Sequence, residues 1–109
     1  MGGTELMCEF RVKVTGLSGE RQVADEIVYV KVGGDGVVLR DILGSAVQVN
    51  SAIVSYVSVT SEEIHLVEHP LVGAFLTLLS KLENSKNKED VKAAWESFVK
   101  EGDKIISEC

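Results

Sequence analysis

The sequence has only two cysteines, no long apolar run and no excess of basic residues. Cys8 and Cys109 lie 101 positions apart, which does not make a disulfide framework. The longest mostly apolar run, residues 70–79, is much shorter than the roughly 18 to 20 residues that cross a bilayer. Residues 1–6 lack the basic start and apolar stretch of a secretory signal. We therefore expect a cytoplasmic protein with reduced thiols and no membrane segment.

The missing basic excess also bears on nucleic acid as a partner. The net charge of the chain is −6, and 26% of its residues are charged. Residues 7–69 carry five lysines and arginines against nine aspartates and glutamates, a net charge of −4, and residues 70–109 carry six against seven. Phosphate backbones repel such surfaces unless basic groups cluster locally. The charge therefore disfavours nucleic acid as a partner.

Catalytic motifs are absent as well. The chain has no Gly-x-Gly-x-x-Gly, phosphate-loop, zinc-knuckle or Ser/His/Asp pattern. His65 and His69 would be roughly 13 Å apart along a strand, too far to bind one ion, so we interpret each as a surface or capping histidine. Aspartate is common in turns, so we interpret Asp35 at a hairpin tip and Asp41 at a strand end as turn residues and not as a catalytic acid pair. We predict that the protein is not an enzyme.

What the sequence does contain is alternation of apolar and polar residues, which predicts strands. Residues 8–15 form one such run, and residues 22–32 predict one long or two short strands in which Ile27 and Tyr29 share a side. Gly33-Gly34-Asp35-Gly36 predicts a tight hairpin that leads into residues 37–39. Further strands are predicted over residues 46–50, 52–59 and 63–68. Such short strands with polar turns indicate a small antiparallel β-barrel of the SH3-like type over residues 7–69.

At Pro70 the apolar spacing changes to that of a helix, which we expect to end near residue 83. Asn87, with Asp90 in the first turn, predicts the cap of a second helix over about residues 88–107. Its apolar stripe contains Val91, Ala94, Trp95, Phe98, Val99, Gly102, Ile105 and Ile106. This stripe must be covered by the barrel, by the first helix or by another chain. The predicted class is α+β, mainly β: an extension (1–6), a barrel (7–69) and a helical tail (70–109).

The order of these features resembles a known family. Met7-Cys8-Glu9 leads into an alternating strand, and Val28-Tyr29-Val30 precedes the Gly-rich hairpin. Residues 38–44, 49–53 and 64–66 follow the middle and end of the same pattern. This arrangement resembles the small CooT-type family, whose archaeal members are described as predicted RNA-binding proteins. The resemblance covers residues 7–68 and leaves out the extension and the tail.

The resemblance implies a homodimeric β-barrel that binds nickel, Ni(II), through a cysteine directly after the initiator Met and supports the maturation of a nickel enzyme. The matching position is Cys8, which follows Met7. Six residues precede Met7, so Cys8 is near a free N-terminus only if Met7 is the natural start. Without the resemblance, a cysteine on the apolar side of a strand is more typical of a core residue. RNA binding and a dimerisation or scaffold role remain the alternatives.

Overall fold

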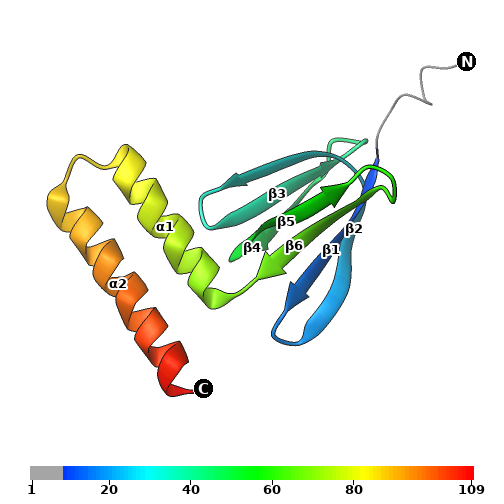
Figure 1. The fold of residues 1–109 in the computed structure, drawn as a ribbon. Coiled ribbons are helices and arrows are strands. Elements are labelled where there is room, and N and C mark those ends of the chain that lie inside the picture. Colours follow the sequence, from blue (N-terminus) through cyan, green and yellow to red (C-terminus); the bar gives the residue numbers. More distant parts are fainter. Residues whose placement is uncertain (1–8) are drawn as a thin grey trace, which may run out of the picture.

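The computed structural model describes residues 9–109, so Cys8 lies outside the described residues. A curled sheet is followed by two helices (Figure 1). The strands are β1 (Phe10–Gly16), β2 (Gly19–Gly33), β3 (Gly36–Asp41), β4 (Ala46–Asn50), β5 (Ala52–Ser58) and β6 (Glu63–Glu68). The helices are α1 (Pro70–Asn84) and α2 (Lys88–Ser107). The predicted class, a mainly β unit followed by two helices, is confirmed.

The sheet has the order β4-β3-β2-β1-β6-β5 and forms a half-barrel. Its neighbours pair antiparallel except β1 and β6, which are parallel, so the expectation of a wholly antiparallel barrel is wrong for this pair. Only Ser51 separates β4 from β5, at opposite edges of the sheet, and its φ is 57°. The chain bends there without forming a hairpin, so β5 runs in the same direction as β4. Because β6 is antiparallel to β5, it runs parallel to β1. This connection draws the two edges together and curls the sheet.

A bulge bends β2 in its middle. Glu26 has a φ of 55°, and the register with β3 shifts between Ile27 and Tyr29. An extra residue turns the following side chains to the other side of the sheet. Ile27 is therefore buried while Tyr29 is 45% exposed, with the Arg40 guanidinium 5.8 Å from the centre of its ring. The expectation that Ile27 and Tyr29 share a side is wrong for this reason.

Every strand contributes to one apolar core inside the curl of the sheet. The alternation predicted for the first and last strands is confirmed, because Val12, Val14, Ile64 and Leu66 are buried and the residues between them are not. Burial of a large aliphatic side chain stabilises a fold by about 1.5 to 3 kcal/mol. The core residues are Val12, Val14, Ile27, Val37, Leu39, Val49, Ala52, Ile64 and Leu66.

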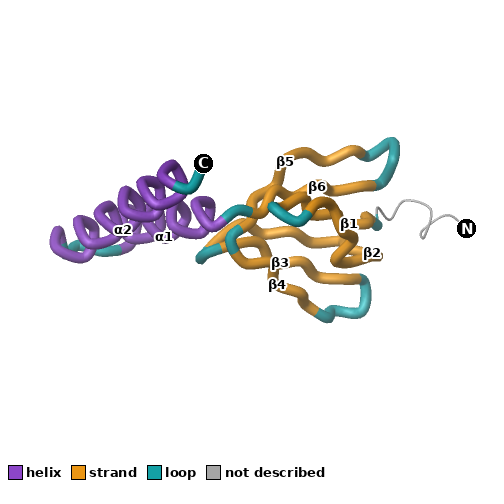
Figure 2. Tube along the Cα trace, turned by 90° about the horizontal axis from the view of Figure 1, so that it is seen from below, coloured by secondary structure: helices purple, strands orange, loops and turns teal. Residues whose placement is uncertain are grey.

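The tail forms a helical hairpin at one end of the sheet, with the helices side by side (Figure 2). The predicted cap of the second helix is confirmed, because the Asn87 side chain accepts a hydrogen bond from the Glu89 N–H at 2.9 Å. Gly73 seats α1 against Ser51, since a Cβ at this glycine would collide with the Ser51 hydroxyl. α2 packs on α1 and has no buried residue. Over residues 9–109, no helix has the length and apolarity needed to span a bilayer.

Candidate functional site

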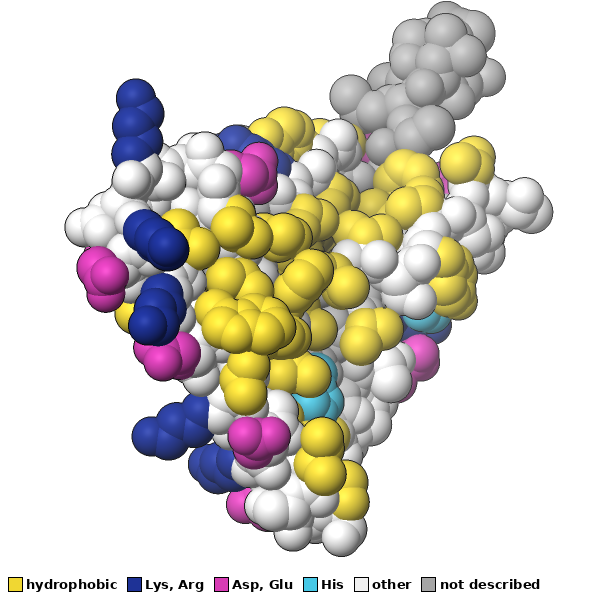
Figure 3. All heavy atoms as spheres, turned by 60° about the vertical axis from the view of Figure 1, so that its left-hand side comes forward, with side chains coloured by type: hydrophobic (Ala, Val, Ile, Leu, Met, Phe, Trp, Pro, Cys, Tyr) yellow, Lys and Arg dark blue, Asp and Glu magenta, His cyan; other side chains and the backbone are white. Residues whose placement is uncertain are grey.

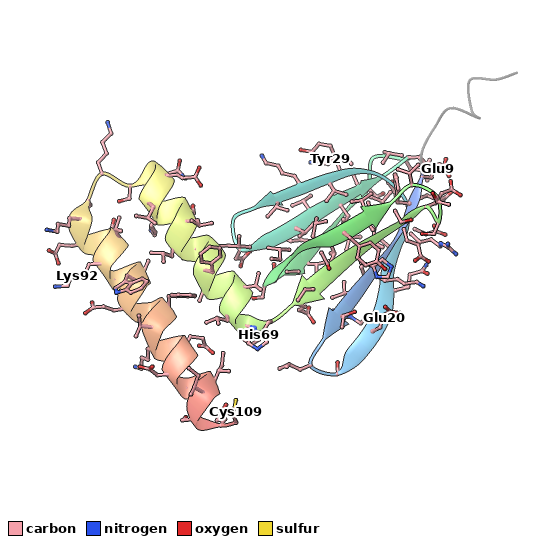
Figure 4. All side chains as sticks on the ribbon, viewed as in Figure 1. Glu9, Glu20, Tyr29, His69, Lys92 and Cys109 are labelled. Atoms are coloured by element: carbon pink, nitrogen blue, oxygen red, sulfur yellow. The ribbon has the colours of Figure 1, made fainter. Side chains whose placement is uncertain are left out.

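The end of the sheet where β1 begins lies opposite the helical tail, and we call it the open end (Figure 4). The two sheet edges, which meet at Ser51, diverge toward it in Figure 2. Glu9 lies at this end, followed by the start of β1. The loops 42–45 and 59–62 border it, because the Ile42 N–H donates to the Glu26 carbonyl and the Arg11 N–H to the Glu62 carbonyl. The predicted metal ligand, Cys8, directly precedes Glu9 in the sequence, but its own position lies outside the described residues.

Apolar side chains are exposed around the open end. Leu43 is 85% exposed and Val59 is 65% exposed, and both lie in the bordering loops. Asp41 holds the first loop in shape, because its Oδ1 accepts hydrogen bonds from the N–H groups of Leu43 and Ser45, both at 2.9 Å. The turn role predicted for Asp41 is confirmed. The loop thus presents an apolar side chain on a fixed backbone.

On the outer face of the sheet, Glu63 is the centre of a charged cluster. The parallel pairing of β1 with β6 places Arg11 beside Glu63 and Lys13 beside His65. Glu63 Oε2 lies 3.2 Å from Arg11 Nη2 and 3.1 Å from Lys13 Nζ, and Oε1 lies 3.0 Å from His65 Nε2. The pKa of Glu63 lies below its ordinary value, mainly because of the His65 hydrogen bond and then that of Lys13. Glu63 on β6 is thus joined to Arg11 and Lys13 on β1, which precede it by 52 and 50 positions in the sequence.

His65 is largely covered in this cluster, with a side chain that is 13% exposed. Its ring stacks on Tyr56, with centroids 4.2 Å apart and planes at 14°. Nε2 faces Glu63, and Nδ1 lies 3.9 Å from Glu20 Oε2. His65 lies on the outer face of the sheet, in agreement with the interpretation of a surface histidine, but Tyr56 and the ion-paired side chains cover most of its ring. Both ring nitrogens face carboxylates, so the arrangement is that of a structural ion-pair network.

The remaining sequence candidates have local structural roles. His69 caps α1, since its Nδ1 accepts a hydrogen bond from the Leu71 N–H at 3.0 Å, which confirms the capping interpretation. Asp35 lies in the predicted hairpin between β2 and β3, which is confirmed. Cys109 is exposed, and its thiol donates to the Ile105 carbonyl at 3.4 Å. Within residues 9–109, no group of three or more histidine, cysteine, aspartate or glutamate side chains could hold a metal ion.

Sequence reasoning missed Glu63 and its neighbours. Arg11 and Lys13 flank an apolar residue on the first strand, and Glu63 and His65 flank an apolar residue on the last. This signal could have identified the cluster only together with the parallel pairing of the two strands. Because parallel neighbours normally require a long crossover, the pairing is not visible in local sequence patterns.

Comparison with protein families matches residues 7–69 to the sequence model of the CO dehydrogenase accessory protein CooT. No curated protein is found to match the chain. Among solved structures, a crystal structure of a candidate CooT from Carboxydothermus hydrogenoformans is similar at a TM-score of 0.51 and 16% sequence identity. The similarity covers 57% of this chain and 98% of that one. At this identity the structural likeness shows the shared fold of the sheet, and the helical tail lies outside the family match.

Proposed function

The chain belongs to the family of the CO dehydrogenase accessory protein CooT, and on this premise we propose that it binds nickel as cargo for a nickel enzyme. The thiolate of Cys8 is the ligand that we assign to the metal. Two copies of the chain share the ion, each supplying one thiolate. The family match carries this proposal, because it begins at Met7 and so includes Cys8 at its second position.

The chemistry of the ligand supports the assignment. A thiolate is a soft and strong donor for late divalent ions such as Ni(II). The other cysteine, Cys109, ends the chain at the opposite end of the molecule from Glu9 (Figure 4). The two histidines are already engaged, His65 with Glu63 and His69 with the backbone of α1. Cys8 is therefore the residue to test first.

The open end supports the sharing of one ion by two copies. A single cysteine per chain leaves most of the coordination sphere to other donors, and a two-fold contact supplies a second thiolate. Leu43 and Val59 expose apolar surface in the loops that border the open end. A contact between two open ends would cover these side chains and bring together the segments that precede Glu9.

Titration of the full chain with Ni(II) tests the proposal through its absorption spectrum. We expect thiolate-to-metal charge-transfer bands that saturate at one nickel per two chains. Cys8→Ser should abolish these bands without unfolding the protein, because a hydroxyl keeps the size of the thiol but is a poor ligand. Cys109→Ser is the matched control and should titrate like the wild type.

Two outcomes would count against the assignment. Nickel bands that survive Cys8→Ser, or that disappear only with Cys109→Ser, would place the metal elsewhere. A chain that begins at Met7 separates the effect of the N-terminal extension from that of the thiol. If this shorter chain also fails to bind nickel, the proposed function fails and a scaffold role takes its place.

RNA binding receives less support from the structure. Arg11 and Lys13 are paired with Glu63, and Arg21 forms two hydrogen bonds of 3.1 Å with Glu68. Three of the five basic residues between positions 7 and 69 are thus matched to carboxylates. Affinity for phosphate backbones requires unmatched positive charge. We expect no retention of the protein on single-stranded RNA, even at low salt.

A further inference from the structure

The helical hairpin leaves a continuous apolar surface uncovered, which Figure 3 shows as a broad yellow area. We call it the tail face. Trp95 is 52% exposed, and Ile106 near the end of α2 is 73% exposed. The tail face consists of Phe75, Leu79 and Leu82 from α1 and of Trp95, Val99 and Ile106 from α2.

Aromatic side chains pack against one another beneath the tail face. Phe98 lies between the two helices, with its ring centroid 6.0 Å from that of Phe75 and 6.0 Å from that of Trp95. An apolar hollow of about 270 Å³ lies beside the rings of Phe75 and Phe98 and reaches Ile53 on β5. The sheet lies on the other side of α1 and does not cover this surface (Figure 1). The sequence allows the barrel, the first helix or another chain to cover the apolar stripe of α2. The first helix covers part of it, because Phe98 packs against Phe75 of α1, whereas the expectation that the barrel covers it is wrong.

We propose that a second copy of the chain covers the tail face, with the two α2 helices antiparallel across a two-fold axis. A half-exposed side chain of this size has an accessible surface on the order of 100 Å². The six side chains of the tail face, together with the polar residues around them, therefore offer an area close to the roughly 800 Å² that each partner buries in a standard interface. A two-fold contact uses the same patch on both copies, so the tail face of each copy would cover the tail face of the other. The hairpins would then form a four-helix bundle.

The charges beside the tail face fit this arrangement. Along the outer flank of α2 the order from its N-terminal to its C-terminal half is Lys92, Glu96, Lys100 and Asp103. In an antiparallel pair centred between Trp95 and Val99, Lys92 of one copy faces Asp103 of the other, and Glu96 faces Lys100. Among residues 9–109, the ion pairs do not include any of these four side chains.

This contact is separate from the one proposed for nickel. Glu9 lies at the opposite end of the molecule from the helices (Figure 4), and the principal extent of the chain is 56 Å. A four-helix contact would keep the two sheets on its outer sides, with their open ends apart. The tail face should therefore associate without metal and without Cys8, whereas metal sharing should not require the tail face.

Sedimentation of the metal-free full chain tests the interface. We expect a dimer whose dissociation constant rises by at least about 100-fold in Trp95→Glu, because a central aromatic residue is lost from both sides. Ala93→Glu adds the same charge on the opposite side of α2 and should leave the dimer intact. Circular dichroism establishes that both variants keep their helices. A monomeric wild type, or a Trp95→Glu variant that dimerises like the wild type, would overturn the proposal.

Charge reversal tests the orientation without altering the apolar surface. Lys92→Asp and Asp103→Lys should each weaken the dimer about tenfold at low ionic strength. The double variant restores opposite charges across the two-fold axis and should return to wild-type affinity. If the double variant is weaker than either single variant, the antiparallel arrangement is wrong. Cys8→Ser should dimerise normally, so loss of nickel binding and loss of the tail contact are distinguishable.

Discussion

The curled sheet and the helical tail differ in how far they cover their apolar residues. The sheet encloses a core to which all of its strands contribute, including Val12, Val14, Val37, Leu39 and Ala52 at 0% exposure. The tail buries only Gly73, Leu76 and Leu78, all on α1. The sheet thus satisfies its apolar pattern within one chain, whereas the tail leaves Trp95 half exposed. An apolar stripe at helical spacing therefore predicts a helix, but it does not predict what covers that helix.

Removal of a core side chain from the sheet should have the largest effect on stability. Leu66→Ala, at a position that is 1% exposed, should lower the free energy of unfolding by about 2 to 5 kcal/mol. Ile106→Ala in the tail, at 73% exposure, should change it by less than about 0.5 kcal/mol. Chemical denaturation of both variants in the Trp95→Glu background keeps the tail contact out of the comparison. Equal losses would show that the tail is as well packed as the sheet.

The contact between the sheet and α1 should be sensitive to a single methyl group. Gly73→Ala places a Cβ against the Ser51 hydroxyl and should cost about 1 to 3 kcal/mol. Ser51→Gly removes that hydroxyl and suits the positive φ of this position. The double variant should therefore recover much of the loss in thermal or chemical denaturation. If Gly73→Ala leaves the stability unchanged, the close contact between α1 and Ser51 does not hold the sheet and the tail together.

The charged cluster should give the smallest effect, a dependence of sheet stability on pH. The folded-state pKa of Glu63 is lowered, so its ion pairs contribute stability above the unfolded-state pKa, which is about 4.3. This contribution is lost as the pH falls through the lower folded-state value. Glu63→Gln should be less stable than the wild type near pH 7 and should approach it in acid. A difference that stays constant with pH would assign the effect to packing.

Local sequence patterns predicted the turns, helix caps and helix starts of this chain, because residues close in the sequence determine these features. The hairpin at Gly34, where φ is 60°, the cap at Asn87 and the helix start at Pro70 each depend on residues a few positions apart. The β2 bulge and the parallel β1–β6 pair depend on distant strands, and so the exposure of Tyr29 and the cluster at Glu63 could not be predicted. The proposed ligand Cys8 came from a family resemblance and stays a prediction.

Native mass spectrometry with and without Ni(II) tests most directly whether the open end and the tail face serve two separate functions. Without metal, wild type and Cys8→Ser should be dimers and Trp95→Glu a monomer. With Ni(II), Trp95→Glu should form a dimer that holds one nickel, whereas Cys8→Ser should remain a dimer without metal. Nickel bound to Cys8→Ser, or a Trp95→Glu variant that stays monomeric and metal-free with Ni(II), would contradict the separation of the two surfaces.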